Sequence, residues 1–124
     1  MALTEDVQQA LDQDQVIDIT TTGRKSGEPS RIETWFHRVG DRYFLTGTPG
    51  KRDWYANLAA NPDFTFHLKR SAQADLPAVA SAIIDTAERR LVLDQVLTSI
   101  GRPSSELDAW VSGAPLVEVT FAAS

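Results

Sequence analysis

The chain has 124 residues, with 12 Lys and Arg against 17 Asp and Glu, which gives a net charge of −5 at pH 7. An acidic chain is a poor match for nucleic acid or an anionic membrane surface, so neither is expected as a partner. Cysteine is absent, which excludes disulfides, thiolate nucleophiles and cysteine-based metal sites and is compatible with a cytoplasmic protein. At this length we expect one domain, residues 1–124, with a single core.

The first half of the chain predicts one short helix and several strands. Its opening residues lack a basic flank and an apolar run, so we expect neither a signal peptide nor an integral membrane segment. Residues 4–11 combine a capping threonine with early acids and helical apolar spacing, which predicts a peripheral helix. Residues 16–22 alternate with a period of two, as a half-buried strand requires. Residues 31–39 and 42–48 flank Gly40-Asp41, the signature of a tight hairpin.

The second half predicts three helices and three strands. A short aromatic helix begins at Asp53 and ends before Pro62, and a capping box at Asp85 and Glu88 opens a longer helix that Gly101 stops. A further short helix is predicted over residues 105–110, and strands over residues 64–68, 74–85 and 116–121. Antiparallel hairpins with helices between strands, and no repeated strand–helix–strand unit, indicate an α+β fold built on a β-barrel.

Positive charge is concentrated in one part of this acidic chain. Residues 24–52 contain seven Lys and Arg against three Asp and Glu, a local charge of +4 that leaves −9 for the remainder. A local positive field on an acidic protein favours a small anionic ligand. The alternative is that these cations lie on the solvated face of a twisted hairpin.

Two short motifs within this region can hold an anion. Gly23 and Gly27 bracket Arg24-Lys25, and a permissive glycine backbone lets amide groups approach a phosphate or carboxylate. The second motif is Lys51-Arg52, where Asp53 can cap a helix whose first amides carry partial positive charge. The chain lacks both a P-loop and the glycine fingerprint of a dinucleotide fold, which argues against nucleoside triphosphate hydrolysis and a Rossmann site.

No catalytic constellation and no metal site can be assigned from the sequence. The Asp, Glu and His residues show no ligand spacing typical of a metal centre. His37 and His67 have no partner visible in the sequence, so we expect a structural or an exposed role for each.

The segments 20–29, Thr-Thr-Thr-Gly-Arg-Lys-Ser-Gly-Glu-Pro, and 53–62, Asp-Trp-Tyr-Ala-Asn-Leu-Ala-Ala-Asn-Pro, together resemble the deazaflavin-dependent nitroreductase family of the flavin/deazaflavin oxidoreductase superfamily. The resemblance implies a split β-barrel of the FMN-binding, pyridoxamine-phosphate-oxidase type, with short helices between antiparallel strands, and usually a homodimer. Members use reduced deazaflavin, coenzyme F420, as hydride donor to nitroaromatics, quinones or activated alkenes. In this chain the family's aromatic C-terminal wall is represented by Trp110 and Phe121.

The resemblance also implies positions for the cofactor. Its phosphate and acidic tail would lie on Arg24, Lys25 and Ser26, with support from Lys51 and Arg52. Its ring would pass close to the backbone of Gly47, Thr48 and Pro49, and the neighbouring helix would contribute Trp54 and Asn57. For Trp54, an anchoring contact between helix and barrel is favoured over contact with a ligand.

The sequence thus predicts an oxidoreductase that binds reduced F420 and passes hydride to a small, planar, electron-poor acceptor near Trp35, Trp54 or Tyr43. The cofactor carries the chemistry in such an enzyme, so no catalytic side chain is required, and the proton would come from solvent or a hydroxyl group. Two alternatives stay open: an FMN-dependent reductase of the same fold, and a non-catalytic module that binds a flavin, a haem-like ligand or an apolar anion.

A homodimer is also predicted. The chain has more apolar strand residues than one short core needs, and some would be buried between subunits: Phe64, Phe66, Val117, Val119 and Phe121.

Overall fold

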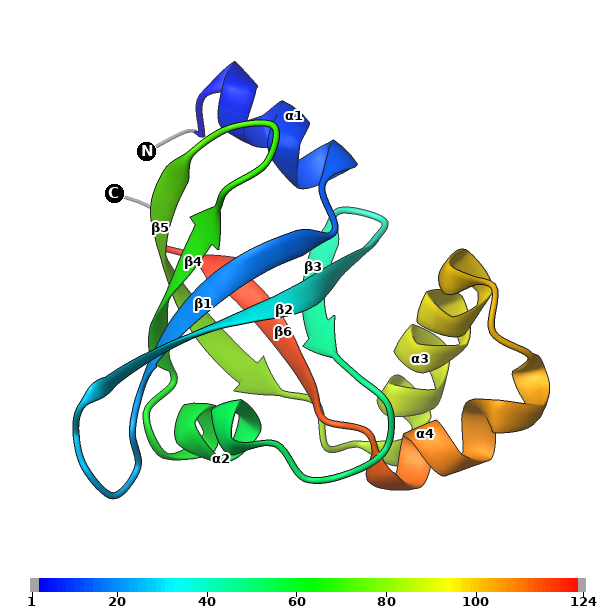
Figure 1. The fold of residues 1–124 in the computed structure, drawn as a ribbon. Coiled ribbons are helices and arrows are strands. Elements are labelled where there is room, and N and C mark those ends of the chain that lie inside the picture. Colours follow the sequence, from blue (N-terminus) through cyan, green and yellow to red (C-terminus); the bar gives the residue numbers. More distant parts are fainter. Residues whose placement is uncertain (1–2, 123–124) are drawn as a thin grey trace.

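The computed structural model describes residues 3–122 and shows six strands closed into one antiparallel barrel (Figure 1). Around the barrel the strands follow the order β1-β2-β3-β6-β5-β4. They are β1 (Val16–Thr22), β2 (Pro29–Val39), β3 (Arg42–Thr46), β4 (Asp63–Leu68), β5 (Ala74–Ala82) and β6 (Leu116–Phe121). The helices are α1 (Glu5–Gln13), α2 (Asp53–Ala60), α3 (Thr86–Ile100) and α4 (Leu107–Gly113), with a 3-10 turn at Ser104–Glu106. The predicted α+β fold on a β-barrel is confirmed.

The predicted elements form, with differences at their ends. The strands predicted over residues 42–48 and 74–85 are shorter, because β3 ends at Thr46 and β5 at Ala82. Asp85 lies beyond β5 and caps α3, since its carboxylate accepts a hydrogen bond from the Glu88 amide at 2.9 Å. Gly101 ends α3 with a left-handed φ of 77°, a conformation that glycine adopts without a side-chain clash.

One face of each strand fills the barrel interior. Along β1, Ile17 and Ile19 are fully buried, whereas Asp18 between them lies on the outer face. Phe36 and Phe66 meet edge to face with ring centroids 5.2 Å apart. The strand residues expected at a subunit contact belong to this interior instead, so they do not support a dimer: Phe64, Phe66, Val117 and Val119 are buried, and Phe121 packs against Phe66.

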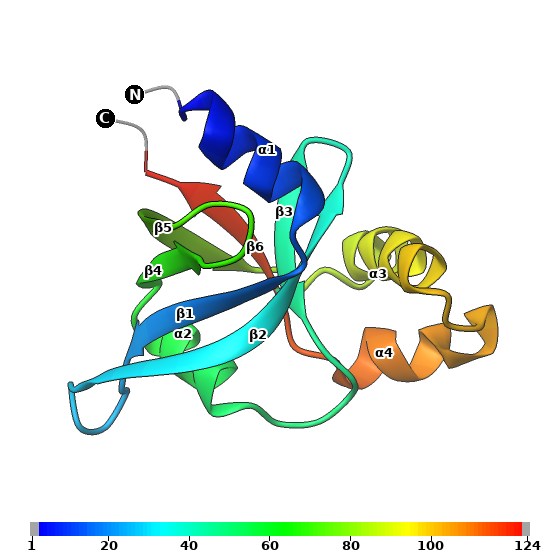
Figure 2. The same cartoon turned by 45° about the horizontal axis from the view of Figure 1, so that its top comes forward.

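Helices cover the two ends and one side of the barrel (Figures 1 and 2). Helix α1 lies over one end, where Ala10 and Leu11 join the barrel core, and α2 lies at the opposite end. Helices α3 and α4 pack together on the outside of the barrel, over Phe44 of β3 and Leu116 of β6. Within residues 3–122, no helix is long and apolar enough to cross a membrane.

Arg89 of α3 is a buried cation in this outer core, with 9% of its surface exposed. Its guanidinium donates hydrogen bonds to four backbone carbonyls, at Ile83 (2.9 Å), Trp110 (3.3 Å), Val111 (2.8 Å) and Ala114 (2.6 Å). The last carbonyls of a helix have no partner within the helix, so Arg89 supplies donors where α4 needs them. The same side chain also ties the end of β5 to both helices.

We expect Arg89→Met to lower the free energy of unfolding by about 3 kcal/mol, because it leaves several buried carbonyls without a donor. Chemical denaturation followed by circular dichroism measures this difference. Arg90→Met is the matched control: its ion pair with Asp108 is exposed to solvent, so the expected loss is under about 1 kcal/mol. Equal losses in the two variants would contradict the role assigned to Arg89.

Candidate functional site

A cavity of about 480 Å³ opens beside the end of β3, between β2, α2 and α4. We call it the tryptophan cavity because Trp35, Trp54 and Trp110 all line it. Trp35 is 51% exposed, whereas Trp54 and Trp110 are buried, so Trp35 offers the most accessible aromatic surface. The other lining residues are Glu33, Thr34, His37, Thr46, Gly47, Thr48, Arg52, Ile100 and Arg102.

Two smaller cavities lie along the N-terminal end of α2. The helix cavity, about 400 Å³, is lined by Arg24, Lys51, Arg52, Asp53, Tyr55 and Ala56. The turn cavity, about 300 Å³, is lined by Gly23, Arg24, Lys25, Ser26, Glu28, Pro29, Ser30, Asp53 and Asn57. Arg52 is shared by the tryptophan and helix cavities, and Arg24 and Asp53 are shared by the helix and turn cavities. The three cavities therefore lie in a row.

The turn between β1 and β2 has a defined conformation set by its own hydrogen bonds. The Gly27 amide donates to the Gly23 carbonyl at 2.9 Å, and the Gly23 amide donates to the Glu28 carbonyl at 2.9 Å. The Ser26 hydroxyl accepts from the Glu28 amide at 3.1 Å. A side chain at Gly23 would meet the Ser26 hydroxyl at 2.5 Å, and Gly27 has a left-handed φ of 71°. Gly27 is thus required by the shape of the turn, and a side chain at Gly23 would displace the Ser26 hydroxyl.

Asn57 of α2 fixes this turn to the helix. Its carboxamide oxygen accepts hydrogen bonds from the Arg24 amide at 3.1 Å and from the Arg24 guanidinium at 2.9 Å. Its nitrogen donates to the Thr21 hydroxyl at 3.3 Å, and the side chain is buried. Arg24 also pairs with Asp53 at 3.4 Å. The structure therefore brings Arg24 and Asn57 together, with Asn57 holding the turn in place.

The start of α2 differs from the sequence prediction. Asp53 was expected to cap the helix, but it is the first helical residue, and its carboxylate faces Arg24 instead. Arg52 occupies the capping position and makes no side-chain capping bond. The first-turn amides of α2 are therefore open to an external acceptor.

The cations of residues 24–52 fall into two groups. Arg24, Arg31, Arg38 and Arg42 form ion pairs with carboxylates. Within residues 3–122, no carboxylate pairs with Lys25, Lys51 or Arg52. These three residues line the row of cavities, which is where uncompensated positive charge accumulates.

The loop from Gly47 to Arg52 connects the tryptophan cavity to α2. Arg52 holds the loop by donating to the carbonyl of Thr48 at 2.9 Å and to its hydroxyl at 3.0 Å. The Gly50 amide donates to the Gly113 carbonyl at 3.1 Å, which attaches the loop to the end of α4. Gly47 and Thr48 line the tryptophan cavity, whereas Pro49 lies against Gly113.

Of the three residues predicted near an acceptor, Trp35 and Trp54 line the same cavity, whereas Tyr43 lies apart from them. Trp35 lines the tryptophan cavity, but Tyr43 lies inside the barrel near α1. The Tyr43 hydroxyl accepts a hydrogen bond from Gln8 at 3.0 Å, and its ring packs 5.5 Å from that of Phe121. The reason is strand alternation, because Tyr43 points inward from β3 while its neighbour Phe44 points outward.

Sequence reasoning missed seven residues of the tryptophan cavity, four of which are His37, Ile100, Arg102 and Trp110, the last noted only as part of an aromatic wall. His37 follows Trp35 by two positions on β2, so alternation places both on one face, but the sequence does not show what lies opposite that face. Burial lowers the pKa of His37 below its ordinary value of 6.5. Ile100, Arg102 and Trp110 come from the α3–α4 segment, whose approach to β2 has no local sequence signal.

Comparison with known proteins identifies the family. Residues 2–107 match the model of the family described as F420H(2)-dependent quinone reductase. Among solved structures, the chain resembles one described as F420 reductase, with a TM-score of 0.72 and 18% identity over 98% of this chain and 97% of that one. A second, described as an F420-H2 dependent reductase, has a TM-score of 0.63 and 21% identity over 86% and 94% of the two chains.

A third similar structure has a different description. It is a putative pyridoxamine 5'-phosphate oxidase from Listeria innocua, with a TM-score of 0.69 and 13% identity over 96% of this chain and 93% of that one. At such identities these likenesses establish the fold, and the fold agrees with the predicted split β-barrel. The family match supplies the activity and the cofactor, and it covers most of the sequence. The chain therefore belongs to the F420H(2)-dependent quinone reductase family and is an oxidoreductase that uses coenzyme F420.

Proposed function

We propose that reduced F420 binds along the row of three cavities at α2. Its ring would lie in the tryptophan cavity, and its phosphate and acidic tail would cross the helix and turn cavities. There it transfers hydride to a planar, electron-poor acceptor beside Trp35. The observation that carries this proposal is the continuity of the row, in which shared residues link an aromatic cavity to a cationic one.

The residues of the row suit a polyanion with an aromatic head. Lys25 and Lys51 are exposed and have no carboxylate partner within residues 3–122. Beside them are the uncapped amides at the start of α2, which are oriented to donate to a phosphate. Ser26 and Arg24 complete the turn cavity, and Gly47 and Thr48 line the tryptophan cavity, where the ring would lie. Charge and shape therefore change along the row in the order that the cofactor requires.

When bound, reduced F420 supplies the hydride. The protein's part is to hold donor and acceptor in one orientation and to exclude water from between them. Trp35 offers an aromatic face for stacking, and Trp54 and Trp110 form buried walls of the same cavity. A planar quinone or nitroaromatic fits this arrangement, and these are the acceptors we propose.

We also infer a cytoplasmic location. Reduced F420 must be regenerated by another oxidoreductase in the same compartment. The absence of cysteine agrees with a reducing environment.

The homodimer remains a proposal, with a different basis from the sequence argument. The outer faces of β1, β4 and β5 carry no helix in the described structure (Figures 1 and 2). Val79 is 37% exposed on β5, and charges of both signs are interspersed on β1, on β2 and directly after β4, which suits contact with a second copy.

The first prediction for the site concerns cofactor affinity. We expect Lys25→Ala combined with Lys51→Ala to raise the Kd for F420 roughly tenfold, because two cations that face a polyanion are lost. Binding should also weaken as salt increases, and the Kd for FMN, with its single phosphate, should change less. Fluorescence titration measures each Kd.

The control for this pair is Arg70→Ala with Arg90→Ala, which removes the same net charge from residues that line none of the three cavities. Its affinity for F420 should match that of the unmodified protein. An unchanged Kd for F420 in the lysine variant would show that neither lysine contributes to binding of the cofactor.

A second prediction concerns the acceptor. Trp35→Ala should raise the KM for menadione at least about threefold and leave the Kd for F420 nearly constant, because a stacking surface for the acceptor is lost. Loss of the absorbance of reduced F420 measures turnover. The melting temperature should change little, since Trp35 is half exposed. A parallel loss of stability and cofactor affinity would show that Trp35 serves the fold instead.

A third prediction concerns assembly. Light scattering should give twice the mass of one chain, and Val79→Arg should shift the protein towards the monomer by placing a charge in the contact. Leu91→Arg on α3, another exposed apolar position, should leave the mass unchanged. A monomer over a wide concentration range would exclude the dimer.

A further inference from the structure

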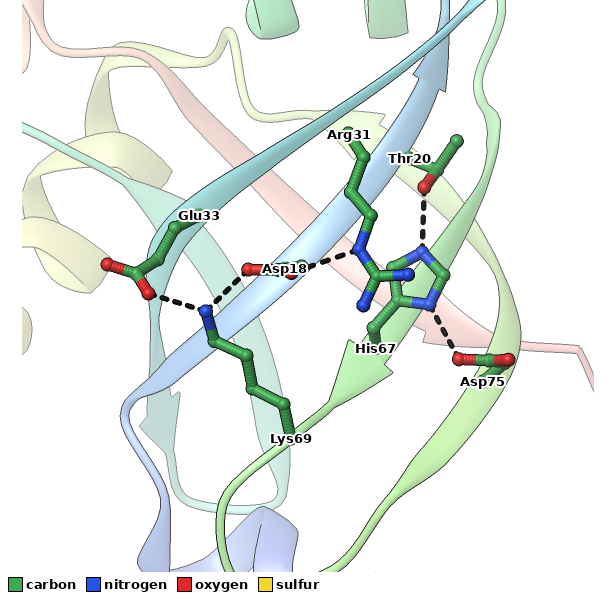
Figure 3. Close-up of polar contacts among 7 residues, drawn as sticks. All are labelled: Asp18, Thr20, Arg31, Glu33, His67, Lys69 and Asp75. Atoms are coloured by element: carbon green, nitrogen blue, oxygen red, sulfur yellow. Dashed lines mark hydrogen bonds and ion pairs between the residues drawn. The ribbon is translucent and has the colours of Figure 1, made fainter.

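The two histidines of the chain are buried to a similar extent but differ in their hydrogen bonds. His67 is 6% exposed and His37 is 8% exposed. The Nε2 atom of His67 lies 2.7 Å from the Thr20 hydroxyl, and its Nδ1 atom lies 2.7 Å from the Asp75 carboxylate (Figure 3). Both ring nitrogens of His67 are therefore occupied within the sheet, which indicates a structural role.

His37 has no such partners. Its ring forms no hydrogen bond or ion pair within residues 3–122. In the same residues, every side-chain nitrogen or oxygen atom that is fully buried has a hydrogen-bond partner. The ring nitrogens of His37 must therefore reach accessible space. That space is the tryptophan cavity, which His37 lines together with Trp35 of the same strand.

The charged groups that line the cavity beside His37 are already engaged. Glu33 pairs with Lys69 at 2.5 Å, as Figure 3 shows, and Arg102 pairs with Glu106 at 2.8 Å. Arg52 donates to the Thr48 carbonyl. Among the described residues that line this cavity, His37 is thus the titratable group whose ring nitrogens are available to form a hydrogen bond with a ligand.

We propose that His37 is a catalytic residue that donates a hydrogen bond to the acceptor oxygen and passes to it a proton taken from water in the cavity. This inference rests on the proposed function, because it requires a quinone-type acceptor beside Trp35.

Hydride transfer to a quinone leaves a need for one proton. The hydride brings two electrons and one hydrogen, and one further proton on oxygen completes the hydroquinone. The deazaflavin is oxidised and returns one proton to water, so the overall reaction neither consumes nor releases protons. His37 donates its N–H proton to the developing oxyanion while its other ring nitrogen takes a proton from water.

The environment of His37 favours the neutral imidazole that this transfer needs. A neutral ring has one donor and one acceptor nitrogen, whereas the imidazolium has two donors and accepts no proton. Burial lowers the pKa of His37 below its ordinary value of 6.5, so the neutral ring predominates at pH 6.5 and above. Activity should therefore fall only when the pH decreases through this lowered pKa and the ring becomes charged.

The test compares three variants under saturating reduced F420 with menadione as acceptor. His37→Phe keeps a ring of similar size without nitrogens, and we expect kcat to fall about 100-fold with the Kd for F420 unchanged. His37→Gln keeps a donor and an acceptor, so kcat should fall less, and the decrease in activity at low pH should disappear. His67→Gln is the control, with kcat within about twofold of the unmodified enzyme. A kcat retained in both His37 variants would overturn the proposal.

A second measurement does not depend on turnover or on a variant that folds. Nitrogen NMR of the untagged protein resolves two imidazoles, because the chain contains only two histidines. In protein loaded with oxidised F420, which donates no hydride, menadione should shift the His37 signals and leave those of His67 in place. Menadione that quenches tryptophan fluorescence without moving the His37 signals would overturn the inference. Failure of the proposed function would instead appear as absent turnover in the unmodified protein.

Discussion

The buried guanidinium of Arg89 fixes the part of the molecule that the barrel alone does not determine. Its four acceptors are backbone carbonyls at the end of β5 and around the last turn of α4, while α3 carries the cation. A hydrogen bond to a backbone carbonyl depends on the path of the main chain and not on the identity of the side chains along it. One side chain therefore sets the position of α4 against the barrel.

The functional site follows from that position. Gly113, at the end of α4, accepts the Gly50 amide, so the loop from Gly47 to Arg52 is attached to the helix that Arg89 holds. Trp110 of the same helix lines the tryptophan cavity. At the other end of the row, Asn57 attaches the cationic turn to α2. The aromatic end and the cationic end of the row are thus positioned by separate contacts, and Arg52 lines the cavities on both sides of their junction. This cationic end is found on a protein that is acidic as a whole.

The sequence was sufficient where the signal is local. The turn at residues 23–27 and the helix after Arg52 are short motifs, and every strand of the barrel was predicted, β1 from alternation and β2 and β3 from the hairpin signal between them. The sequence was insufficient where the pairing of strands decides which way a side chain faces. Tyr43 and Trp35 are both strand aromatics, but only the register and the closure of the barrel show that one faces inward and the other faces the cavity. The same limit applies to His37, because the cavity that it lines is completed by residues of α3 and α4, which are distant in sequence.

The strand order has a consequence for synthesis of the protein. Strand β6 lies between β3 and β5, and its last residue, Phe121, pairs with Ala78. Until residues 116–121 leave the ribosome, β3 and β5 each lack a neighbour and expose an unpaired edge. The nascent chain therefore cannot close its barrel early. The apolar residues of the first five strands stay incompletely buried until the sixth strand pairs. Such a chain depends on protection from aggregation during most of its translation, even though the finished barrel leaves no long edge exposed.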